Sequence, residues 1–123
     1  PLTMMPHSTH LFLEQVSQKL WEGCSFPIKT DHVIQATTLS GDKNNPIKDN
    51  IASFENARLD KLAFQEYHHL YPHDQYTVGF SGRPGGEHFY VNMINNTLAH
   101  GPGGQNQQHA VEKEADPCFA KVV

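Results

Sequence analysis

One segment near the start of the chain has apolar residues at helical spacing. In residues 5–23 these positions are Phe12, Leu13, Val16 and Leu20. They recur at three- and four-residue intervals, which predicts an amphipathic helix with this side turned to the core. Pro6 suits the first helical turn, where its missing N–H would be unsatisfied anyway. Gly23 is a natural end of the helix.

The rest of the chain alternates short β-type runs with turn-forming residues. Branched and aromatic residues predict strands at 24–29, 32–38, 64–67, 76–80, 88–93 and 118–123. Pro27 marks the first of these as an edge strand or a break. The stretches 39–50 and 95–117 are polar and predict loops. Residues 57–63 also fit a second, short helix.

This order of elements indicates the fold class. One helix is followed by several short strands, and no internal repeat is visible. The pattern favours a mainly β architecture, a barrel or sandwich with a capping helix.

Length and charge limit the classes of function. The chain has 123 residues, enough for one domain with one core. It carries 13 acidic side chains against 9 lysines and arginines, a net charge of −4. This balance argues against nucleic acid as a partner, because a basic surface supplies most of that affinity. No apolar run in the visible chain approaches the ~20 residues of a membrane span.

The two ends read as cut from a longer protein. The chain opens with PLTMMPH, without an initiator methionine, and stops at CFAKVV, in the middle of a predicted strand. We therefore expect 1–123 to be a single domain truncated at both ends.

The cysteines leave two alternatives open. Cys24 and Cys118 have no CxxC spacing, which argues against a thiolate metal site. They are either two buried thiols or a disulfide. Asn95 to Thr97 (NNT) forms a glycosylation acceptor pattern. Together these features favour the secretory pathway, such as the Golgi lumen, or another organelle lumen.

The histidines do not predict a metal site. They include His68, His69, His73, His88, His100 and His109. His69 and His73 have the four-residue spacing of a helical metal site, but Pro72 between them breaks the helix that it needs. We expect solvated loop histidines, whose titration could make binding pH-sensitive.

Neither glycine-rich loop completes a known catalytic motif. The stretches GRPGGEH (82–88) and HGPGGQ (100–105) lack the Lys and Ser/Thr of a phosphate-binding loop. The chain also has no nucleophile-elbow pattern for a hydrolase. We expect no metal and no cofactor. Arg83 then reads as a solvated loop charge.

Two neighbouring aromatic residues in a predicted strand indicate that both faces of the sheet are in use. Phe89 and Tyr90 are adjacent in a predicted strand, so their side chains point to opposite faces of the sheet. One of them belongs to the core, and the other belongs to a second layer or a groove.

Four blocks stand in order along the chain: FLEQVSQKLWEGCSF, HVIQA, TVGFSGRPGGEHFYVNM and CFAKVV. Together they resemble a cyclophilin-type peptidyl-prolyl cis-trans isomerase domain, in a divergent version similar to algal and protist sequences. The resemblance implies an eight-stranded antiparallel β-barrel closed by two helices. This chain would lack the first strands and the last helix and strand.

The resemblance also implies a peptide-binding groove. In that family, an apolar pocket holds a proline while an arginine weakens the amide resonance that makes prolyl rotation slow. It implies Gln35 as the groove glutamine and Tyr90 as the aromatic floor, with Phe89 facing the core. The implied groove residues are Val33, Ile34, Gln35, Gly79, Phe80, His88, Tyr90 and Phe119.

The chain departs from the family at the chemistry itself. Where the family has Phe-His-Arg, this chain reads FPIK, with Ile28 at the arginine position or Lys29 after a one-residue shift. Lysine cannot reproduce the planar fork of an arginine. Phe80 replaces the clamp asparagine, and the tryptophan and histidine that roof the pocket have no counterpart.

These departures lead to three hypotheses. The first is a cyclophilin-like domain with weak or no isomerase activity, which serves as a peptide-binding or structural module of a larger protein or assembly. Its partner would be a protein or a proline-containing peptide. The second is an active divergent isomerase in protein folding, with Lys29 or Arg83 as the substitute catalytic cation. The third is a luminal or cell-surface structural domain.

Overall fold

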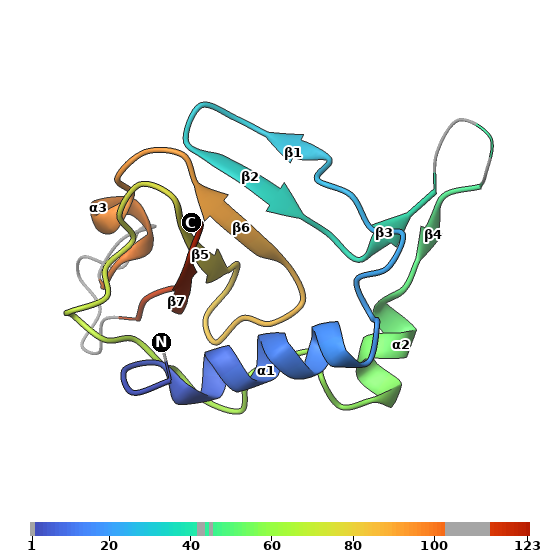
Figure 1. The fold of residues 1–123 in the computed structure, drawn as a ribbon, viewed down its shortest axis with the longest axis horizontal. Helices are drawn as coiled ribbons and strands as arrows, with labels where there is room; N and C mark the ends of the chain where they lie inside the picture. The colour runs from blue at the N-terminus through green and yellow to red at the C-terminus, as the bar shows by residue number, and fades with distance from the viewer. Residues whose placement is uncertain (1, 42–43, 45, 103–113) are drawn as a thin grey trace.

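The computed structural model describes residues 2–41, 44, 46–102 and 114–123. Five antiparallel strands form its main sheet, in the order β1-β2-β6-β5-β7 (Figure 1). These strands are β1 (Ile28–Lys29), β2 (Val33–Ala36), β5 (Thr77–Phe80), β6 (Phe89–Asn92) and β7 (Cys118–Lys121). A two-residue hairpin and three helices complete the described elements: β3 (Leu39–Ser40), β4 (Lys48–Asp49), α1 (Pro6–Ser17), α2 (Ile51–Asn56) and α3 (Thr97–His100).

The main sheet is open among the described residues. Strands β1 and β7 form its two edges and do not pair with each other. The mainly antiparallel β character is confirmed, within a mixed arrangement of strands and helices. A closed barrel does not form in the described part of the chain, because no strand there joins the two edges.

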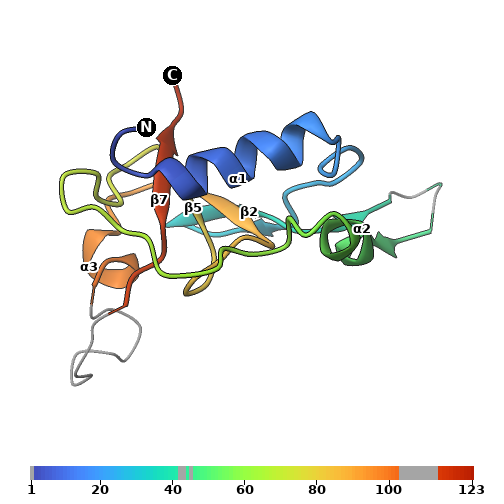
Figure 2. The same cartoon turned by 90° about the horizontal axis from the view of Figure 1, so that it is seen from below.

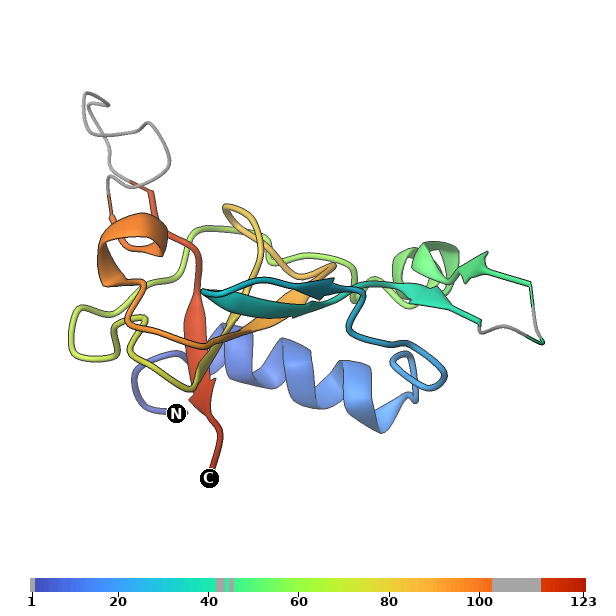
Figure 3. The same ribbon diagram turned by 90° about the horizontal axis from the view of Figure 1, so that it is seen from above.

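Helix α1 covers one face of this sheet, and α3 lies on the other side (Figures 2 and 3). The core lies under α1. Its buried members are Met5, Leu11, Leu62, Val78, Phe80 and Phe119. The Phe12 ring on α1 lies 5.1 Å from that of Phe89 and 5.2 Å from that of Phe119, centroid to centroid. These aromatic contacts fasten the helix to β6 and β7.

Helix α1 begins where predicted but turns a different face inward. Its buried residues are Ser8, Leu11 and Gln15. Leu13 and Val16, predicted to face the core, are 55% and 49% exposed. The inward face of α1 is set by a polar side chain, Gln15, which is buried together with its hydrogen-bond partners. The Gln15 Nε2 donates to two backbone carbonyl oxygens, those of Leu59 at 2.8 Å and Gly86 at 2.7 Å.

The segment 57–76 contains neither the predicted helix nor the predicted strand at 64–67. Its Glu66 instead serves the first turn of α1, where one carboxylate oxygen accepts the Ser8 N–H and hydroxyl, each at 2.7 Å. Unpaired N–H groups at a helix start need such acceptors. Burial opposes ionisation of Glu66, but the hydrogen bonds from Ser8 and His7 outweigh it and lower the carboxyl pKa.

The remaining predictions were partly right. Strands β2, β5, β6 and β7 confirm four predicted runs, and β1 is the predicted edge strand. The predicted loop 39–50 contains the β3–β4 hairpin, and the predicted loop 95–117 contains α3. Within the described residues, no helix has the length and apolar character to cross a membrane.

Candidate functional site

Four of the predicted groove residues share the face of the sheet opposite α1. Gln35 pairs with Tyr90 across β2 and β6, and Tyr90 pairs with Gly79 across β6 and β5. Directly paired residues point to the same face, and Val33 joins them because it lies two residues from Gln35. The strand register therefore gathers these four positions, which we call the Tyr90 face.

Three other predicted groove residues lie elsewhere. Phe80 and Phe119 are 0% and 1% exposed and belong to the core under α1. Ile34 pairs with Val91 and therefore faces the α1 side. The structure separates these residues from Tyr90, because neighbours along a strand alternate between faces.

The side chain of Tyr90 is enclosed by groups from its own chain. It is 2% exposed, and its hydroxyl donates to the Oδ2 of Asp116 at 2.9 Å. The ring stacks on that of His73, with the centroids 6.0 Å apart and the planes at 8°. The His100 ring lies 4.9 Å away on a tilted plane. The expected floor of a peptide groove is thus covered.

Asp116 is the centre of this polar cluster. Its carboxylate accepts from Arg83 Nε at 3.0 Å, from Tyr90 and from His100 Nδ1 at 3.3 Å. The Asp116 and Arg83 side chains are only 3% and 7% exposed. Burial alone would raise the pKa of Asp116, but the hydrogen bonds from His100, Arg83 and Tyr90 outweigh it and lower that pKa. The site therefore holds a buried ion pair.

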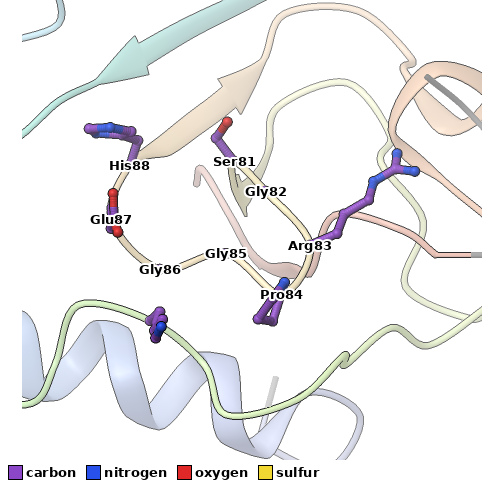
Figure 4. A pocket seen from close by; sticks show the side chains of 9 residues that line it. Ser81, Gly82, Arg83, Pro84, Gly85, Gly86, Glu87 and His88 are labelled. Atoms are coloured by element: carbon purple, nitrogen blue, oxygen red, sulfur yellow. The ribbon is translucent and has the colours of Figure 1, made fainter. Parts of the chain in front are cut away.

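Arg83 is not the solvated loop charge that its sequence context suggested. Its guanidinium also donates to the carbonyl oxygen of Glu114 at 3.0 Å. The loop between β5 and β6 carries the Arg83 side chain toward α3 (Figure 4). Pairing with Asp116 offsets the cost of burying this cation.

His73 is likewise buried, against the expectation of solvated loop histidines. It is 0% exposed. Its Nε2 lies 2.8 Å from the Asp116 carbonyl oxygen, and its Nδ1 lies 3.1 Å from the amide Nδ2 of Asn92. These partners fix the neutral tautomer, with Nε2–H donating and Nδ1 accepting. Burial lowers the pKa of His73 to about 4.

The GRPGG loop is a structural connection. Its hollow of about 270 Å³ is lined by Lys61 and by residues 81–88 of the loop itself, which Figure 4 labels. Gly86 has φ +139°, and a Cβ there would lie 2.5 Å from the Lys61 Cα. The loop is therefore packed against the segment around Lys61, which precedes β5 in the chain. The predicted groove residue His88 lines this hollow.

Lys29 lies on the side of the sheet away from Tyr90. It pairs with Ile34, so it shares the α1-side face with Ile34 and Val91. There it borders a second hollow of about 790 Å³. Ile28, its neighbour on β1, pairs with Gln35 and occupies the row of Tyr90 instead.

The cysteines are free thiols in this structure, so the candidate disulfide is not formed. The Cys24 sulfur lies 3.8 Å from the Asn50 amide nitrogen, whereas the Cys118 sulfur donates to the Pro72 carbonyl oxygen at 3.4 Å. Burial raises the pKa of Cys118 to about 12. The two thiols therefore occupy separate environments.

Two further predictions concern surface chemistry. Asn95 is exposed, and its amide donates to the Asp74 carboxylate at 3.1 Å. Its glycosylation stays a prediction. Within the described ranges, no three His, Cys, Asp or Glu side chains are grouped as metal ligands. His109, and residues 103–105 of the HGPGGQ stretch, lie outside the described residues.

Sequence reasoning missed Asp116 and Asn92. Asn92 had a signal, because it lies two residues after Tyr90 on the same strand and so shares its face. Asp116 had none, because it is distant in sequence from both Arg83 and Tyr90 and lies outside any strand.

Comparisons with known proteins do not identify the chain. A scan against models of protein families finds no match, and a search of curated proteins also finds none.

Proposed function

We propose that this chain is a cyclophilin-like domain that has lost most or all isomerase activity and serves as a peptide-binding or structural module. One observation carries the proposal: the Tyr90 side chain is 2% exposed, and its hydroxyl is bonded to Asp116. An isomerase needs this surface open, because a proline ring has to pack on it.

Among the described residues, neither candidate for the catalytic cation is free to act on the Tyr90 face. Ile28, an aliphatic residue, occupies the edge of the Gln35 row. Arg83 is engaged by Asp116, and Lys29 belongs to the opposite face. A cation has to approach the proline nitrogen to weaken amide resonance, and neither side chain meets this requirement. This geometry disfavours an active divergent isomerase.

The barrel is part of the same proposal. The open edges at β1 and β7 are where further strands would join to close it, supplied either by the same protein or by a partner. The alternative of a luminal structural domain loses one of its two supports, because Cys24 and Cys118 are free thiols.

The test is exchange NMR on a proline-containing tetrapeptide, with and without the protein. We expect the time constant of cis–trans exchange to stay at its uncatalysed value, of the order of tens to hundreds of seconds. Saturable acceleration that Gln35→Ala abolishes would overturn the proposal. Acceleration that Lys29→Ala removes would instead establish the divergent isomerase.

A further inference from the structure

The hollow beside Lys29 lies on the α1 side of the sheet, and none of the described residues that line it belongs to α1. We call it the Val91 groove. Its apolar lining consists of Phe26, Ile34, Tyr76, Val91, Met93 and Val122. Its volume is about 790 Å³, comparable to that of pockets that hold small molecules or peptide side chains. Three of these side chains are well exposed: Phe26 at 39%, Tyr76 at 47% and Val122 at 50%.

The groove reaches the edge of the sheet at β1. Both residues of β1 are exposed, and β1 pairs only with β2 among the described strands. An extended segment that added itself along β1 would satisfy the backbone groups on this open side. Every second side chain of that segment would point to the face of Lys29 and Ile34, and so into the groove. The geometry therefore selects an extended strand with alternating apolar residues.

The charge at the groove selects a further feature of the partner. Of the described residues that line it, Lys29 alone is charged. An acidic side chain among the inward-facing residues of the partner would meet this cation. A second copy of the chain fits less well, because two-fold pairing of β1 with itself brings Lys29 close to its own copy.

We propose that the Val91 groove binds an extended peptide segment of a partner protein, through pairing with β1, alternating apolar side chains and one carboxylate that contacts Lys29. This deepens the proposed function, since it names the surface and the partner of the module. It places binding on the face opposite Tyr90.

The test uses a fluorescein-labelled octapeptide that alternates threonine and valine, with one central valine replaced by aspartate. Fluorescence anisotropy measures its affinity for the 123-residue chain. We expect saturable binding that Val122→Asp weakens about tenfold, through loss of the apolar contact of one valine. The matched control is Val16→Asp on α1, which is 49% exposed against 50% for Val122 and lies outside the groove. It is expected to leave the affinity unchanged.

A charge exchange tests the contact with Lys29. Lys29→Glu is expected to weaken binding about threefold, the usual size for an exposed ion pair. A peptide with lysine in place of aspartate is expected to bind Lys29→Glu more tightly than it binds the wild type.

Four results would overturn the inference: absence of saturable binding, equal loss in Val122→Asp and Val16→Asp, loss of binding in Gln35→Ala on the Tyr90 face, or self-association in sedimentation that Val122→Asp abolishes. The last would assign the groove to a second copy. None of them bears on isomerase turnover, which the exchange experiment measures separately, so failure of either idea is recognisable on its own.

Discussion

Burial of a neutral histidine makes the stability of this protein depend on pH in a defined direction. His73 is 0% exposed, and burial lowers its pKa to about 4. In the unfolded chain the same imidazole titrates near its ordinary value of about 6.5. Between these two values the unfolded state binds a proton that the folded state rejects. The free energy of unfolding therefore falls as the pH is lowered through this window.

The size of this loss of stability depends on how far the pH is lowered below about 6.5, the pKa of the unfolded chain. At pH 5 the unfolded chain has about 1.5 pH units of excess proton affinity, and each unit corresponds to about 1.4 kcal/mol. His73 alone should thus lower the stability by about 2 kcal/mol between pH 7 and pH 5. The carboxylates of Asp116 and Glu66 act below this window, because their folded pKa values are lowered from ordinary values near 4.

Urea unfolding at a series of pH values measures this effect. We expect the wild type to lose stability from pH 7 to pH 5 more steeply than His73→Gln, which has no titrating ring at that position. The exposed His69 supplies the control, because His69→Gln should keep the slope of the wild type. If the stabilities of the wild type and His73→Gln stay a constant distance apart over this range, the assignment of a buried neutral imidazole is wrong.

Three more predictions follow from buried polar groups. Arg83→Met should lower the free energy of unfolding by about 3–5 kcal/mol in urea titrations, because it removes the cation that pairs with the buried Asp116 carboxylate. Gln15→Met should cost about 1–3 kcal/mol in the same assay, since one buried and one partly buried carbonyl oxygen lose their donor. Iodoacetamide should alkylate Cys24 in the native protein but Cys118 only after unfolding, as followed by mass spectrometry, because the Cys118 thiol is 0% exposed with its pKa raised to about 12.

Each of these has a clear contrary result. Lys48→Met, at an exposed position on β4, should leave stability almost unchanged. An equal loss there would show that the loss in Arg83→Met does not come from the buried ion pair. A Gln15→Met protein as stable as the wild type would show that these carbonyl groups find other donors. Equal alkylation rates at the two thiols in the native state would contradict the burial of Cys118.

The strands were the most predictable part of this fold. Branched and aromatic runs with turn residues on both sides sufficed for β2, β5, β6 and β7, because such signals are local. The helix face was less predictable. Leu13 and Val16 fit the apolar pattern but are exposed. Gln15 is buried instead, because its amide donates to carbonyl oxygens of distant segments. Apolar periodicity does not register a polar side chain that is buried with its partners.

The candidate site shows the same division. That Phe89 and Tyr90 face opposite ways follows from their adjacent positions in a strand, because side chains alternate between the two faces of a sheet. The sequence pattern does not reveal what covers Tyr90. Only in the folded chain do Asp116 and His73 contact Tyr90 while Arg83 pairs with Asp116, from the segments before β7, before β5 and after β5. Contacts between such segments depend on how loops close over the sheet, and no spacing within one segment records that closure.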